Sequence, residues 1–183
     1  MTSNRERALG AAIGILADEG IRALTHRRVD ERARLPQGST SNAFRTRAAL
    51  LVGVAEHMVA TELPTLESLV RAGSPEQLAD ELSTLFDRLT GPFRAQTAAR
   101  LALFVEASHD EAVRAALGRG RARIADPLRS VFAELGAPDP DLGVQLVATC
   151  FEGLFLHVIG RYAEVDPRPI IAATVRAALT AQR

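Results

Sequence analysis

The chain of 183 residues has no tryptophan, one tyrosine and one cysteine, Cys150. A single cysteine excludes an internal disulfide framework. Aromatic residues make up 4% of the chain and hydrophobic residues 47%, so the core must be built mainly from Leu, Ala and Val. This aliphatic mixture favours helices, and the length suits one large domain or a small domain joined to a larger one.

Lysine is absent, and arginine supplies all 22 basic side chains. The formal net charge is zero, so the whole-chain charge does not indicate a nucleic-acid partner. The distribution is uneven, because residues 1–58 hold nine Arg against six acidic residues, whereas residues 59–183 hold 13 against 16. This imbalance indicates that the N-terminal third faces an anionic partner.

Long apolar runs and a signal-peptide pattern are also missing. No apolar run approaches the roughly 18 residues that a membrane span needs. We therefore expect a cytoplasmic protein with no membrane contact.

Helix start and stop signals recur along the chain. Ser3 and Glu6 form a capping box, and Gly20 ends the apolar pattern that follows. Thr25 is a candidate N-cap for a short second helix, and Pro64 is expected to end or kink the fourth. Further N-cap candidates precede the downstream helices, at Ser74, Asp110, Asp139 and Asp166. Since no strand-like alternation is present, we predict an all-α fold.

Residues 142–159 differ from the other predicted helices, because apolar or small side chains occupy almost the whole circumference. A helix that is apolar nearly all round needs cover on every side. The last helix, with Ile170, Ile171 and Val175, is similar. We expect these last two helices to form a homodimer interface; a central position in a monomeric bundle is the alternative.

Residues 35–44, LPQGSTSNAF, lie between two stretches with helical patterning. Pro36 suits the first turn of a helix, and Phe44 is expected to anchor its end in the core. Three short helices, two of them joined by a turn of about four residues, indicate a helix-turn-helix. Gly38 would allow the backbone to approach a phosphate. Four short polar residues would face base edges in the major groove: Gln37, Ser39, Ser41 and Asn42.

A longer pattern runs from Arg7 to Leu51. Its elements are Ala11-Ala12, Leu16, Glu19-Gly20, Leu24-Thr25-x-Arg27-x-Val29, Ala33, Leu35, Gly38, Phe44 and Arg47-x-x-Leu50-Leu51. This pattern resembles the tetracycline-repressor (TetR) family of bacterial transcriptional regulators. The rest of the chain is similar to the family in length, helical pattern and the F-E-G-L run of the penultimate helix.

The resemblance implies a helix-turn-helix DNA-binding domain over residues 1–46 and a larger helical ligand-binding and dimerisation domain over residues 47–183. It also implies a homodimeric repressor that a small-molecule effector releases from a double-stranded DNA operator. Residues at the family's DNA-contacting positions are Thr25, Arg27, Gln37, Gly38, Ser39, Ser41, Asn42, Arg45 and Arg47.

The chain departs from the family pattern inside this segment. Ser41 and Ala43 stand where family members often carry Tyr and an aromatic residue or His, so the operator cannot be inferred by analogy. Arg34 stands where the turn commonly has Gly. Thr40 replaces a usual apolar residue and is expected to pack less tightly above the core.

The effector is expected to be apolar, because few charged residues lie on the predicted inward faces. Candidate pocket residues are Phe86, Phe93, Phe104, His109, Phe132, Phe151, Phe155 and His157. A DNA-binding dimer that needs no ligand is one alternative, and a helical-bundle enzyme or carrier is a less favoured one.

An enzyme is not expected. Glu106 and His109 have the E-x-x-H spacing of di-iron bundles, but no second copy exists, so a structural role is favoured. Cys150 has apolar neighbours and is interpreted as a small core residue. The sequence therefore predicts no catalytic residues, no metal site and no cofactor.

Overall fold

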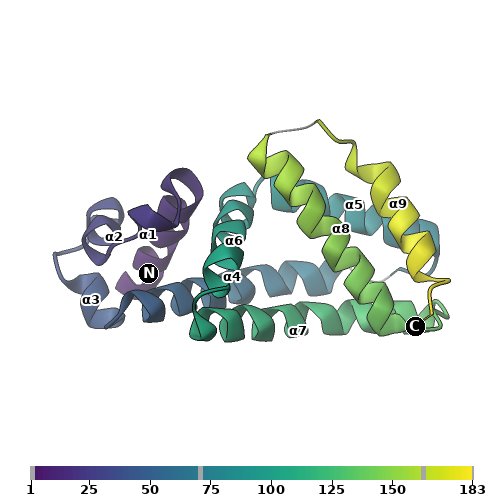
Figure 1. The fold of residues 1–183 in the computed structure, drawn as a ribbon, viewed down its shortest axis with the longest axis horizontal. Helices are drawn as coiled ribbons and strands as arrows, with labels where there is room; N and C mark the ends of the chain where they lie inside the picture. The colour runs from purple at the N-terminus through teal and green to yellow at the C-terminus, as the bar shows by residue number, and fades with distance from the viewer. Residues whose placement is uncertain (1–2, 70–71, 162–163, 183) are drawn as a thin grey trace. The chain divides into compact units, whose positions relative to one another are not determined.

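A computed structural model of the chain describes residues 3–69, 72–161 and 164–182, and this part contains helices and no strand (Figure 1). The all-α prediction is confirmed. The elements are α1 (Asn4–Glu19), the 3-10 helix η1 (Ile21–Ala23), α2 (His26–Ala33), α3 (Ser39–Ala43), α4 (Arg47–Leu69), α5 (Pro75–Thr90), α6 (Arg94–Ala107), α7 (Glu111–Glu134), α8 (Pro140–Gly160) and α9 (Pro167–Ala178).

The predicted caps are present at the helix N-termini. The Ser3 and Glu6 pair closes a capping box on α1, and the Thr25 side chain accepts a hydrogen bond from the Arg28 N–H. Ser74, Asp110, Asp139 and Asp166 each accept from the first turn of the helix that follows. Helix α4 continues through Pro64 to Leu69, so this residue does not end the helix, and a kink there stays a prediction.

The chain forms two compact units, and each unit is made of two separate stretches of the sequence. One contains Met1–Thr61 and Ala95–Gly120, and the other contains Glu62–Arg94 and Arg121–Arg183. Helices α4 and α7 each begin in the first unit and end in the second. The division into DNA-binding residues 1–46 and ligand-binding residues 47–183 is a functional one and stays a prediction.

In the first unit, helices α1 and α2 pack with α4, α6 and the start of α7 around a single apolar core. Large side chains with almost no exposed surface fill it: Leu9, Ile15, Leu24, Val29, Leu50, Leu51, Met58, Leu103 and Val113. The predicted aliphatic core is therefore present, and α1 with α4 gives α2 and α3 a rigid support.

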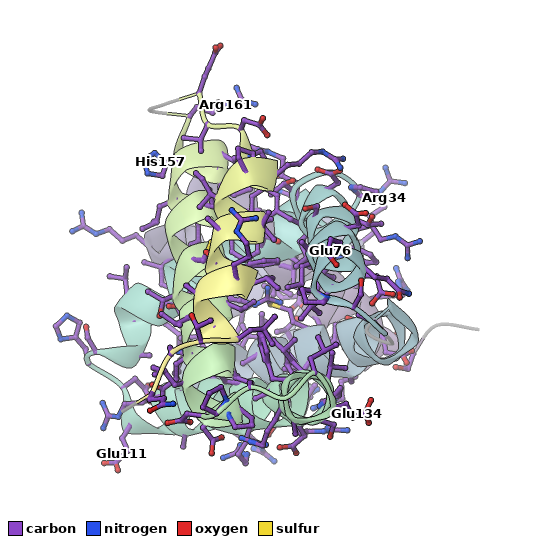
Figure 2. All side chains as sticks on the ribbon, turned by 90° about the vertical axis from the view of Figure 1, so that its right-hand side faces the viewer. Arg34, Glu76, Glu111, Glu134, His157 and Arg161 are labelled. Carbon is purple, nitrogen blue, oxygen red and sulfur yellow. The ribbon has the colours of Figure 1, made fainter. Side chains whose placement is uncertain are left out.

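In the second unit, α5, α8 and α9 pack together, and α8 and α9 lie side by side in opposite directions (Figure 1). The Arg94 guanidinium donates to the carbonyls of Val158 and Ile159, at the C-terminal end of α8. Arg161 follows this end (Figure 2). It adopts a left-handed conformation with φ of 55°. These contacts satisfy carbonyls that a helix end leaves free.

Helix α8 is long and apolar enough to cross a membrane by length and composition alone, with a mean hydropathy of 1.7. The expectation that no run approaches this length was therefore wrong. Only 28% of its apolar window is buried within the chain, so much of its surface lacks cover from the chain itself.

Candidate nucleic-acid interface

The turn between α2 and α3 contains two left-handed residues. Arg34 caps the C-terminus of α2 with φ of 52°, at the position where the family commonly has Gly, and its side chain extends into solvent (Figure 2). Gly38 has φ of 90° and is the N-cap of α3. Helix α3 thus begins at Ser39, three residues later than Pro36, because a residue in this conformation cannot lie inside a right-handed helix.

The Asp30 side chain of α2 holds the N-terminus of α3. One carboxylate oxygen, Oδ2, accepts from the Gly38 N–H at 2.8 Å, and Oδ1 accepts from the Thr40 N–H at 2.8 Å. The Thr40 hydroxyl also donates to Oδ1. Because Gly38 has no side chain to cap the helix, Asp30 satisfies two backbone N–H groups that would otherwise be free.

Asp30 and Thr40 are both buried, with 4% and 0% of their surface exposed. Thr40, expected to pack less tightly above the core than an apolar residue, is fully buried, and its hydroxyl has a charged acceptor inside the protein. Burial would raise the pKa of Asp30, but hydrogen bonds from Thr40 and Gly38, with nearby His26, keep the pKa below its usual value. The carboxylate is thus charged at neutral pH.

The other end of α3 is anchored by Phe44, which was correctly predicted to be in the core. Its carbonyl accepts a hydrogen bond from His26 Nε2 at 2.8 Å, and the Arg5 guanidinium lies 5.0 Å from its ring centroid. Gly53 of α4 faces the ring so closely that a Cβ there would come within 2.5 Å of it. Helix α3 is therefore fixed to α2 at both ends and to α4 at one.

The outward face of α3 and the turn before it carry short polar groups. Gln37, Ser41 and Asn42 are exposed, as is the small side chain of Ala43. The Ser39 hydroxyl donates to the Pro36 carbonyl at 2.6 Å and the Ser41 hydroxyl to the Gly38 carbonyl at 2.9 Å, so each oxygen retains lone pairs that can accept. Gln and Asn can form two hydrogen bonds with an adenine edge, and a small apolar group can contact a thymine methyl.

The arginines of α2 are less available than the sequence suggested. Arg28 pairs with Glu19, and Arg32 pairs with Asp18 and Glu19, so acidic residues at the end of α1 neutralise them. Arg27 pairs with Glu31 one turn later. Thr25 is exposed beside them and uses its oxygen to cap α2.

Two further cations follow α3. Arg45 is exposed and forms no ion pair with any residue that the structure describes. Arg47, the first residue of α4, donates to Glu106 Oε1 at 2.7 Å and to the Ile21 carbonyl at 3.0 Å. The predicted DNA-contacting residues thus lie in one contiguous stretch of the first unit, with Arg47 already bound to another side chain.

The predicted pocket residues are divided between the two units. Phe86, Phe151 and Phe155 form one buried cluster with ring centroids 5.3–5.7 Å apart. Phe93, Phe132 and His157 belong to the same unit, whereas Phe104 and His109 belong to the first unit. His109 is exposed just after α6, and His157 lies near the C-terminal end of α8 (Figure 2). Cys150, expected in the core, is only half-buried.

Asp30 was missed by the sequence reasoning, although one signal was available. A glycine N-cap leaves helix N–H groups without a side-chain acceptor, and Asp30 is an acid eight residues before Gly38 on a neighbouring helix. No group of His, Cys, Asp and Glu within the described ranges could hold a metal ion.

The comparison with protein families gives a match over residues 73–181 to the tetracyclin repressor-like C-terminal domain. The chain belongs to the TetR family. The resemblance carried by residues 7–51 therefore agrees with an independent match in the other part of the chain. No curated protein sequence matches the chain.

Several solved structures share this TetR fold. A candidate transcriptional regulator from Streptomyces coelicolor A3(2) is 25% identical, with a TM-score of 0.75 and coverage of 97% of this chain and 98% of that one. A transcriptional regulator from Rhodococcus sp. Rha1 is 20% identical, with a TM-score of 0.84 and coverage of 97% and 96%. FadR from Bacillus subtilis, solved with stearoyl-CoA, is 15% identical, with a TM-score of 0.75 and coverage of 94% and 96%.

The Asp30 contacts generate a stability prediction. Asp30→Asn should lower the free energy of unfolding by about 1.5–3 kcal/mol at neutral pH, because it removes a charged acceptor and turns an amide donor toward backbone donors. Denaturant titration measures this loss. Asp18→Asn is the matched control, since its carboxylate is exposed and its ion pair should be worth about 0–1 kcal/mol.

The pH dependence follows from the lowered pKa of Asp30. Its contribution is complete above the unfolded-state pKa of about 3.9 and is lost as the pH falls through the lower folded-state pKa. The stability difference between wild type and Asp30→Asn should therefore stay constant down to about pH 5 and shrink below about pH 4. A difference that widens on acidification would contradict this account of Asp30.

Proposed function

We propose that the protein is a homodimeric DNA-binding transcriptional regulator, acting as a repressor that an apolar effector releases from its operator. The observation that carries the proposal is the exposed polar face of α3, held at one end by Asp30 and at the other by Phe44. A five-residue helix is too short to be stable by itself, so these anchors are needed to present its side chains in one orientation.

The chemistry of the exposed side chains suits base recognition in the major groove. Gln37 and Asn42 carry both donors and acceptors, and the hydroxyls of Ser39 and Ser41 have free lone pairs. Arg45, which forms no ion pair within the described part of the chain, supplies a positive charge for a phosphate. Bulky aromatic groups are absent from this face, so hydrogen bonds would dominate the readout.

Fluorescence anisotropy with duplex fragments of the DNA flanking its own gene tests this proposal. Asn42→Ala should weaken binding to the preferred fragment by about 1–3 kcal/mol and reduce discrimination between fragments. Arg45→Ala should weaken binding to all fragments equally and lower the salt dependence by about one phosphate contact.

The matched control is Arg123→Ala, which removes an exposed arginine from the second unit and should leave DNA affinity unchanged. If all fragments bind wild type and Asn42→Ala equally, α3 does not read bases.

The dimer would form through α8 and α9. Leu156 on α8 is 52% exposed and Ile170 on α9 is 40% exposed, although both are large apolar residues. Together with the low burial of α8, this leaves an apolar surface that a second copy would cover. A dimer would place two copies of α3 about 34–36 Å apart, in successive major grooves.

Leu156→Arg should convert the protein from a dimer to a monomer of 19.6 kDa in sedimentation velocity, because a charge would be buried without a partner. Val105→Arg is the control, since Val105 is 68% exposed but belongs to α6 in the other unit. An unchanged dimer in Leu156→Arg, or a monomer in Val105→Arg, would place the interface elsewhere.

The effector would bind in the second unit beside the cluster of Phe86, Phe151 and Phe155. Edge-to-face and stacked rings of this kind offer an apolar, polarisable surface. The complex of FadR with stearoyl-CoA is consistent with an apolar effector in a protein of this fold. Such a ligand shifts DNA binding only by its difference in affinity between two states.

The absence of tryptophan provides a direct assay. Phe155→Trp introduces a single tryptophan next to Phe86, 5.3 Å between ring centroids in the wild type. Stearoyl-CoA, tested first, should change its emission in a saturable way and lower DNA affinity over the same concentrations. Saturable binding of any apolar compound without an effect on DNA affinity would favour the ligand-independent alternative.

A further inference from the structure

The contact between Arg47 and Glu106 joins two segments that are distant in sequence. Arg47 begins α4, directly after the cap residue Thr46, whose hydroxyl oxygen accepts from the Ala49 N–H at 3.0 Å. Glu106 is the next-to-last residue of α6. Both belong to the first compact unit, so their 2.7 Å contact lies within a single packed body.

The environment of the pair favours a strong interaction. The Glu106 side chain is only 23% exposed and that of Arg47 is 43% exposed, so water screens this pair less than the pair of Arg27 and Glu31. A second Arg47 nitrogen donates to the Ile21 carbonyl at 3.0 Å. The guanidinium is therefore oriented by two acceptors and keeps one edge toward solvent.

The Glu106 carboxylate and a DNA phosphate are chemically similar partners for Arg47. A carboxylate and a phosphate each present two oxygens to the planar guanidinium, and both bind it with charge-assisted hydrogen bonds. A phosphate that approached Arg47 would meet the negative charge of Glu106 beside it. The two anions repel each other, so Arg47 can bind a DNA phosphate with its full charge only after its ion pair with Glu106 breaks.

We propose that Glu106 sets the DNA affinity of the protein by competing with a backbone phosphate for Arg47. The proposal rests on the proposed function, because it requires that the first unit binds DNA. It predicts that the wild type binds every duplex more weakly than a variant in which residue 106 carries no charge to compete for Arg47. Sequence preference is unaffected, because phosphate contacts carry no base information.

The test is Glu106→Gln, which keeps the size of the side chain and removes its charge. Affinity for a preferred and a random duplex should rise equally, by about two- to fivefold, the range set by partly exposed ion pairs. In the wild type, the phosphate that binds Arg47 releases a cation, but the freed Glu106 carboxylate takes one up. The variant has no such carboxylate, so the slope of log affinity against log salt should become steeper by up to about 0.9. Equal or weaker binding than wild type would overturn the proposal.

Glu56→Gln is the matched control. Glu56 lies on α4 in the same unit and pairs with Arg119 at 3.1 Å, so the substitution removes the same charge from a pair without Arg47. Its DNA affinity should equal that of wild type at about 0.15 M salt, where screening acts within about 8 Å. A rise equal to that of Glu106→Gln would show a general charge effect and overturn the competition.

A double-mutant cycle with Arg47→Ala separates the remaining explanations. Glu106→Gln should raise DNA affinity much less in the Arg47→Ala background, because competition for Arg47 is removed and only direct repulsion of the phosphate remains. An undiminished rise in that background would contradict the proposal. Failure of the wild type to bind any duplex would instead refute the proposed function, so the two outcomes are distinguishable.

Discussion

The buried carboxylate of Asp30 is the interaction on which the geometry of the helix-turn-helix depends. Helix α3 has five residues and a glycine N-cap, so neither its length nor its own side chains can stabilise its first turn. The carboxylate replaces the missing cap from the neighbouring helix, and Thr40 supplies a third donor. A buried charge of this kind is tolerated because its hydrogen-bond partners are in place.

The arginines of α2 form ion pairs with nearby acidic residues, and the protein has no excess of positive charge. The net charge is zero, and most arginines near α2 are neutralised by acids of α1 or α2 itself. Arg47, the first residue of α4, is paired in the same way with Glu106, so this contact would bear on DNA affinity. On α3, the small side chains of Ser41 and Ala43 stand where bulkier residues are common in the TetR family.

Local signals were predicted well from the sequence, and contacts between distant residues were not. The capping box at Ser3, the cap at Thr25 and the core position of Phe44 depend on neighbours within a few residues. The late start of α3 follows from the positive φ of Gly38, which its sequence alone does not specify. Thr40 and Arg47 were described without their partners, since Asp30 and Glu106 lie 10 and 59 residues away. The pocket candidates are divided between the two units, and their common role stays a prediction.

Hydroxyl-radical footprinting on the DNA flanking its own gene tests the central claim most directly, because the claim concerns the position of α3 on a duplex. The account predicts two protected tracts on one face of the DNA, centred about 10–10.5 base pairs or a multiple of this apart, with both tracts lost together in Asp30→Asn. Uniform protection along the fragment, or a pattern that Asp30→Asn leaves intact, would contradict it.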